Sequence, residues 1–137
     1  MREVLKPIFH YLIHILLVFV MIKFFANDYL SIISLIFGAI IIMFDSLPEV
    51  RKIGIRKYFY LRSVLDNWKY RKYFLHTPVT LVISLTLSIL TLAPMTFYFG
   101  LFFFSMSIHL LLDLIEMKFM YKIPIRSWLF KSDWRLV

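Results

Sequence analysis

The residues best suited to chemistry are histidines and carboxylates that fall within or beside apolar runs. His109 and Asp113 stand four apart in the run at residues 96–117, TFYFGLFFFSMSIHLLLDLIEM. Residues four apart share one face of a helix. An ionisable residue inside a membrane-spanning segment costs roughly 2.5–3.5 kcal/mol on insertion scales, so it is rare there and usually has a function. A histidine and an aspartate on one stripe can bind one divalent metal ion.

Three other apolar runs carry polar residues at a corresponding depth. His10 and His14 stand four apart in the first run, Asp45 follows the second and His76 precedes the third. Histidines and carboxylates from four helices in one layer fit a metal site in the core of a helical bundle. We predict a general base, Asp45 with Glu49 as the alternative, and four metal ligands: His14, His76, His109 and Asp113.

Each of these residues also has a structural interpretation. A histidine in a membrane helix more often packs or hydrogen-bonds than binds a metal, and His10 could be an interfacial side chain. Asp45 could accept hydrogen bonds near a helix end. Asp113 could pair with a basic residue of the long connection. The sequence also leaves open whether His10 or His14 is the ligand from the first helix.

The donor types limit the metals that the predicted site would suit. The chain has no cysteine, so thiolate sites are excluded. Nitrogen and oxygen donors suit Zn²⁺, Mn²⁺ or Fe²⁺. We expect a divalent metal, with zinc as the first choice and manganese as the second. Such an ion lowers the pKa of its bound water and polarises a phosphoryl oxygen, while a carboxylate that is not a ligand serves as general base.

Composition identifies the class of protein that must position these residues. The chain has 137 residues, of which 61% are hydrophobic and 19% aromatic, and its mean hydropathy is +0.81. Soluble domains are about 45–50% apolar, so we predict a single integral membrane domain over residues 1–137. The net charge of +8 indicates cytoplasmic flanks and contact with anionic lipid headgroups. Nucleic-acid binding is not expected, because no binding motif accompanies the charge.

Four apolar segments approach the roughly 20 residues that cross a bilayer. They cover residues 7–26, 29–44, 78–92 and 94–117. The first is too long for the core of a signal peptide. Pro7, Pro78 and Pro94 fall at predicted helix starts, where proline is tolerated. We therefore predict an all-α, four-helix transmembrane bundle, with Gly38 and Gly100 as candidates for close helix packing.

Lysine and arginine concentrate at the N-terminus, in the connection at residues 45–77 and in the tail at residues 118–137. The positive-inside rule therefore predicts a multi-pass protein of the inner membrane, with both termini and the long connection in the cytoplasm. This connection mixes basic and aromatic residues, which is typical of a segment lying on the headgroups. Gripping a phosphate-bearing substrate is the alternative role for it.

The order of these motifs resembles the YdjM-like family of inner-membrane, metal-dependent hydrolases. Residues 107–113, SIHLLLD, are similar to the family's Ser-His-x-x-x-Asp helix. Residues 44–48 stand where the family has Pro-Asp-x-Asp-His, and residues 71–77 where it has His-Arg-Gly-x-Thr-His-Ser. The tail contains a similar Pro and Trp pattern. The resemblance implies that four residues belong to the site: Asp45, His76, His109 and Asp113.

The chain also departs from the family pattern. Leu47 and Pro48 replace the second acid and the histidine of the first motif, and Arg71 replaces the first histidine of the second. We predict a hydrolase acting at the cytoplasmic leaflet on a phosphoester or similar bond of a lipid-linked substrate. The alternative is a non-catalytic assembly or scaffold protein with a degenerate site. A proton-coupled transporter is a third possibility. Membrane lipids are expected partners, and homo-oligomerisation is left open.

Overall fold

The computed structural model describes residues 2–46, 51, 75, 77–91 and 94–119, and within them the regular secondary structure is all helical, with no strand. The elements in order are α1 (Arg2–Phe25), α2 (Tyr29–Ile41), η1 (Ile42–Ser46), α6 (Pro78–Leu90), η2 (Pro94–Thr96) and α7 (Phe97–Phe119), where η denotes a 3-10 helix. The prediction of an all-α protein is confirmed. The connection at residues 45–77, predicted to be interfacial, and the tail at residues 118–137, predicted to be cytoplasmic, fall almost wholly outside the described residues.

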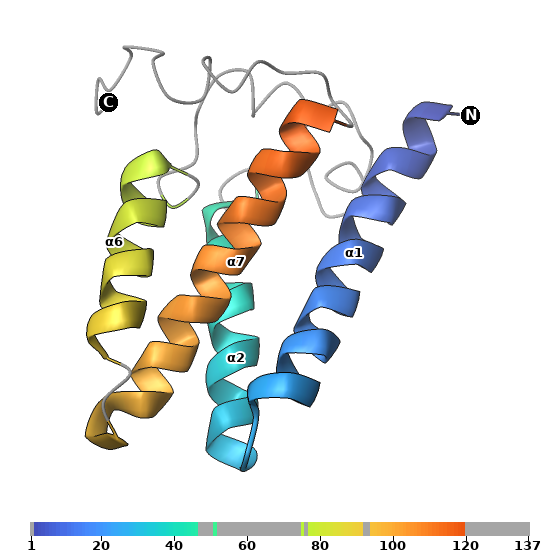
Figure 1. The fold of residues 1–137 in the computed structure, drawn as a ribbon. Helices are drawn as coiled ribbons and strands as arrows, with labels where there is room; N and C mark the ends of the chain where they lie inside the picture. Colours follow the sequence, from blue (N-terminus) through green and yellow to red (C-terminus); the bar gives the residue numbers. More distant parts are fainter. Residues whose placement is uncertain (1, 47–50, 52–74, 76, 92–93, 120–137) are drawn as a thin grey trace.

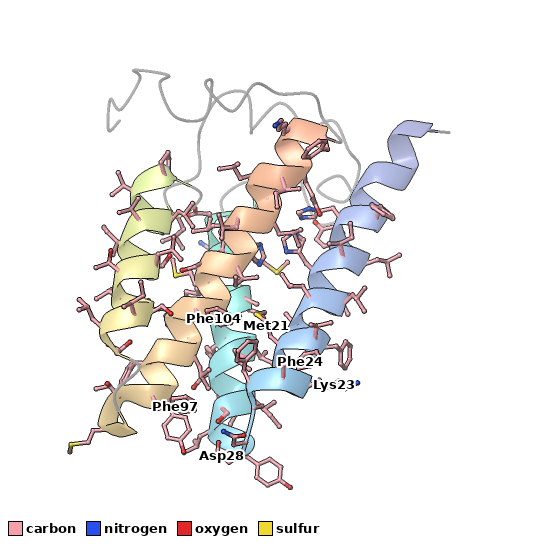
Figure 2. All side chains as sticks on the ribbon, in the orientation of Figure 1. Met21, Lys23, Phe24, Asp28, Phe97 and Phe104 are labelled. Carbon is pink, nitrogen blue, oxygen red and sulfur yellow. The ribbon has the colours of Figure 1, made fainter. Side chains whose placement is uncertain are left out.

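The helices lie side by side and alternate in direction (Figure 1). The start of α1 and the end of α7 lie at one end of the structure, which we call the terminal end. Asp28 and Phe97 mark the opposite end in Figure 2. Helix α7 contacts α1, α2 and α6, so it is the element against which the others pack.

Helices α2 and α6 begin at the predicted residues, and a capping side chain precedes each of them. Asp28 caps α2 by accepting a hydrogen bond from the Ser31 N–H at 2.7 Å. Thr77 caps α6 by accepting from the Thr80 N–H at 3.1 Å, and Pro78 follows in the first turn, where its missing N–H is no loss.

The starts of the other two helices differ from the prediction. Helix α1 begins at Arg2, so Pro7 lies inside the helix rather than at its start. At this position proline lacks the N–H for one helical hydrogen bond and its ring crowds the carbonyl four residues earlier, but its fixed φ is helical and the affected bond lies in the second turn. Helix α7 begins at Phe97, because residues Pro94–Thr96 form a separate 3-10 turn.

Small residues bring α7 close to its neighbours. A Cβ atom at Gly38 of α2 would overlap the Phe102 carbonyl oxygen of α7 and lie 3.0 Å from Ser105 Cβ. Ser105 Oγ donates to the Leu35 carbonyl at 2.6 Å. The absence of a side chain at Gly38 therefore permits backbone contact, and the prediction of close packing at this glycine is confirmed.

Polar side chains are buried and large apolar ones are exposed. The buried serines are Ser31, Ser84, Ser88, Ser105 and Ser107, and exposed apolar residues include Leu16, Phe19, Phe24, Phe37, Val82 and Ile89. Buried apolar residues form two small clusters. One consists of Met21, Leu35 and Leu101, and the other of Ile42, Met106 and Leu110. In Figure 2, Met21 and Phe104 point between the helices, whereas Phe24 and Lys23 point outward. Soluble domains show the opposite distribution.

One described helix is long and apolar enough to cross a membrane, over residues Phe97–Glu116. The other three helices contain shorter apolar stretches, Phe9–Phe25, Tyr29–Asp45 and Pro78–Leu90. The structure thus supports one candidate span, and the predicted arrangement of four spans is taken up below as a proposal.

Candidate metal centre between α1 and α7

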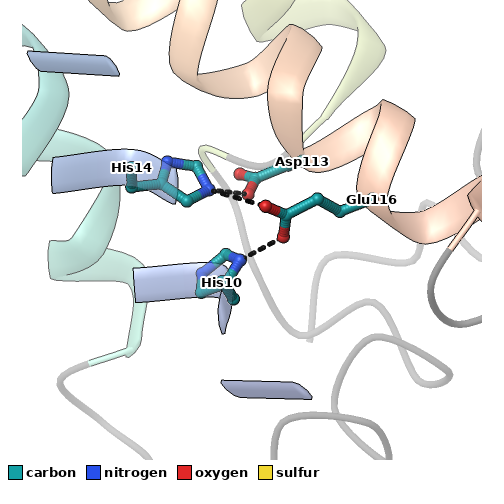
Figure 3. Close-up of side chains that lie close together, drawn as sticks. All are labelled: His10, His14, Asp113 and Glu116. Carbon is teal, nitrogen blue, oxygen red and sulfur yellow. Dashed lines mark hydrogen bonds and ion pairs between the residues drawn. The ribbon is translucent and has the colours of Figure 1, made fainter. Parts of the chain in front are cut away.

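Two histidines of α1 face two carboxylates of α7 near the terminal end (Figure 3). His10 and His14 are one helical turn apart, with ring centroids 4.3 Å from each other. Asp113 and Glu116 are three residues apart, so they project from the same face of α7. On each helix, the spacing of the residues therefore places two potential metal ligands next to each other. The packing of α1 on α7 brings the two pairs together.

The side chains contact one another across the two helices. His10 Nδ1 is hydrogen-bonded to Glu116 Oε2. His14 Nε2 lies 3.1 Å from Asp113 Oδ1 and 3.9 Å from Glu116 Oε1. One potential ligand atom from each residue lies within 4.8 Å of those from the others. Bonds of 2.0–2.2 Å in a tetrahedral zinc site place ligand atoms roughly 3.3–3.6 Å apart, so the group is near that spacing and would contract around an ion.

Burial strengthens the case for an ion. The side chains of Asp113 and Glu116 are only 3% and 5% exposed, whereas that of His10 is 22% exposed. His14 Nε2 and Glu116 Oε1 are buried and make no hydrogen bond within the described part of the chain. Buried polar atoms are normally hydrogen-bonded, and buried charges are paired or coordinate metals. The group therefore has the donors, the spacing and the unmet polar atoms that a metal ion would satisfy.

His109 is adjacent to this group but is not one of the four. Its ring centroid lies 4.1 Å from that of His14, and its Nε2 atom lies 3.5 Å from Asp113 Oδ2. The predicted His109 and Asp113 pair is thus in contact, and the predicted ligand His14 joins it. Asp113 presents one oxygen to each of the two histidines.

No family model, curated protein or solved structure matches this chain. The resemblance to the YdjM-like family therefore stays a prediction, and the case for function rests on the geometry of the site.

Asp45, the predicted general base, has a different neighbour. Its Oδ2 atom accepts a hydrogen bond from the Leu75 N–H, so it joins η1 to the residue two before the Thr77 cap of α6. Asp45 is not one of the four clustered residues. His76, the remaining predicted ligand, and Glu49, the alternative base, lie outside the described residues.

Sequence reasoning missed Glu116 and left His10 undecided. Glu116 lies at the end of the apolar run, where a carboxylate is easily read as a flanking residue. A signal was nevertheless present, since residues 109, 113 and 116 follow the four-then-three spacing of one helical stripe. His10 and His14 both belong to the group that could hold an ion, so the structure offers both as candidate ligands.

Proposed function

We propose that the chain is a multi-pass membrane protein that binds a divalent metal ion between α1 and α7. The ion would serve in hydrolysis of a phosphoester or similar bond of a lipid-linked substrate at the cytoplasmic leaflet. The observation that carries the proposal is the cluster of His10, His14, Asp113 and Glu116, with ligand atoms within 4.8 Å of one another.

The distribution of apolar surface supports the membrane location. Large apolar side chains cover the outside of the helices, and serines and ionisable residues occupy the interior. The exposed apolar surface would be solvated by lipid, and the alternation of helix direction suits repeated crossing. Asp113 and Glu116 lie toward the end of α7, so the cluster is nearer the terminal end, and the basic N-terminus in the sequence favours the cytoplasm for that end.

The donor set supports metal-dependent hydrolysis. Two nitrogens and two carboxylates suit zinc, with manganese as the second choice. A bound ion of this kind lowers the pKa of its water ligand and polarises a phosphoryl oxygen. Asp113 and His14 form the buried side of the group, and His10 is its most exposed member. Water and substrate would therefore reach the centre past His10, while Glu116 is nearly as buried as Asp113.

Metal content and activity of the detergent-solubilised protein test this proposal. We expect zinc or manganese in the purified protein, and release of inorganic phosphate from phosphatidic acid or polyprenyl phosphate in mixed micelles. The matched variant is Glu116→Gln, which keeps shape but loses the ionic donor. We expect this variant to lower activity by at least the roughly 10–100-fold seen when residues supporting a metal site are changed. Treating the unaltered protein with a chelator should also lower its activity. Absence of bound metal, together with unchanged thermal stability in chelator, would contradict the proposal.

A second candidate is a non-catalytic membrane assembly or scaffold protein. The specific observation in its favour is that His10 with Glu116, and His14 with Asp113, already join α1 to α7 through ion-pair contacts. Asp45 also accepts a hydrogen bond from the Leu75 N–H and does not belong to the cluster. For such a protein, Glu116→Gln would lower thermal stability, and phosphate release would be absent from the unaltered protein as well.

A further inference from the structure

The two oxygens of Asp113 are directed at different histidines. Oδ1 lies 3.1 Å from Nε2 of His14, which is one of the four clustered residues, and Oδ2 lies 3.5 Å from Nε2 of His109, which is not. Both histidines are buried, and their rings lie against each other with centroids 4.1 Å apart. The carboxylate thus has one oxygen on the side of the proposed ion and one on the side of His109.

A neighbouring residue must hold the two oxygens in these positions, because the terminal torsion of the side chain does not fix the orientation of a carboxylate. The terminal torsion of aspartate is broad and roughly two-fold, so Asp113 alone could offer either oxygen, or both, to an ion. An N–H group directed at Oδ2 selects one orientation and leaves Oδ1 for the ion. The helix holds His109 one turn before Asp113, and burial keeps bulk water from replacing its N–H.

We infer that His109 is a positioning residue, which donates from Nε2 to Asp113 Oδ2 and so aims Oδ1 at the metal ion. This inference rests on the proposed metal site. A small rotation of either side chain would bring the 3.5 Å separation to the 2.7–3.2 Å of a hydrogen bond. Partners of this kind orient metal ligands and raise the affinity of the site.

Two substitutions at His109 separate positioning from direct ligation. His109→Gln keeps an N–H donor near the place of Nε2, while the amide is a poor ligand for zinc or cobalt. His109→Leu keeps bulk but has no donor. Each full-length, metal-free protein would be titrated with Co²⁺ in detergent, because visible absorption of bound Co²⁺ reports the number and type of its ligands.

We expect His109→Leu to weaken Co²⁺ binding by roughly 10–100-fold. His109→Gln should bind within a few-fold of the unaltered protein. The absorption bands at saturation should be the same in all three, because the ligand set is unchanged. A purely structural role would instead move the Tm of the metal-free protein and leave the affinity alone.

The inference is overturned if His109→Leu binds Co²⁺ as tightly as the unaltered protein. It is also overturned if both variants lose affinity equally and their bands shift, since His109 would then be a ligand. In both cases the unaltered protein binds metal and the proposed centre stands. If the unaltered protein binds no Co²⁺, the proposed centre itself is wrong, and the role of His109 falls with it.

Discussion

At the scale of single residues, the burial of Asp113 and Glu116 dominates the electrostatics. Two carboxylates three residues apart on one helix face repel each other, and their removal from water adds a desolvation cost. Each has a histidine of α1 beside it, at His14 and His10. Those contacts offset part of the cost, and a divalent cation among the four side chains would offset more, which is why the cluster favours a metal.

A third carboxylate, Asp28 at the opposite end of the structure, gives a pH prediction. It accepts hydrogen bonds from the Tyr98 O–H at 2.6 Å, the Ser31 N–H at 2.7 Å and the Ser31 O–H at 2.8 Å. The Tyr98 bond first, and then those from Ser31, hold the pKa of Asp28 below its ordinary value of 3.8. Because the folded-state pKa is depressed, the stabilisation is complete above that value and is lost as pH falls through the folded-state pKa.

Thermal unfolding against pH measures this contribution. We expect the Tm difference between the unaltered protein and Asp28→Asn to be constant from neutral pH to about pH 5, and to shrink below pH 3.8. Tyr98→Phe is the control. It removes the largest cause of the lowered pKa of Asp28, so the stabilisation from Asp28 should be lost at a higher pH. Parallel Tm curves down to pH 2 for all three proteins would contradict this role.

The individual residues of the site were partly predictable from the sequence. His14 and Asp113 stood out because ionisable residues are rare in apolar runs, and helical spacing placed Asp113 on the same face as His109. Glu116 was missed because its place at the end of the run resembled an ordinary flank. Which helices pair is a tertiary property, so the contact of Asp113 with His14 could not be read from spacing along one helix.

At the scale of elements, the contact of α2 with α7 depends on Gly38. We expect Gly38→Ala to destabilise the protein by about 1–3 kcal/mol, as overpacking of a close contact does. The new Cβ would overlap the backbone carbonyl oxygen of Phe102, which cannot move away as a flexible side chain would. Denaturant or thermal unfolding in detergent would measure the loss.

Ser34→Val is the matched control for Gly38→Ala, one turn earlier on the same helix. Ser34 lines an open groove of about 460 Å³ between α2 and α7, so the larger side chain has room there. We expect a change of no more than about 0.5 kcal/mol, as at ordinary surface positions. If both substitutions lower the free energy of unfolding equally, α2 is sensitive to substitution in general, and the close contact at Gly38 is not the cause.

Helix starts that carry a local capping signal were predictable from the sequence. Asp28 and the Thr77-Pro78 pair are cap and first-turn signals with a local physical cause, and α2 and α6 begin at the expected residues. The end of α2 was not predictable in the same way, because residues Ile42–Ser46 continue as a 3-10 helix. In this turn the Asp45 carboxylate accepts a hydrogen bond from the Leu75 N–H, a contact with a distant part of the chain that local spacing does not reveal.

At the scale of the whole molecule, α1 is less embedded than α7. Among its described side chains, His14 and Met21 are the only buried ones, and its outward face is apolar. Composition alone predicted a helical protein with such lipid-compatible surfaces. It could not predict that α7 contacts all the other helices, nor that half of the proposed metal centre would come from the helix with the least burial.

The sparse burial of α1 predicts that the metal ion holds this helix against α7. The chain has no cysteine, so spin labels attach only where cysteines are introduced, as in Leu12→Cys with Ile115→Cys, both exposed positions. We expect one narrow distance distribution with Zn²⁺ and a broader one in chelator, because without the ion the repulsion of Asp113 and Glu116 is only partly offset. Val82→Cys with Ile115→Cys, which joins α6 to α7, should give the same distribution in both conditions. If the α1 pair is equally narrow in chelator, the histidine–carboxylate contacts alone fix α1, and the metal ion has no part in holding the helices together.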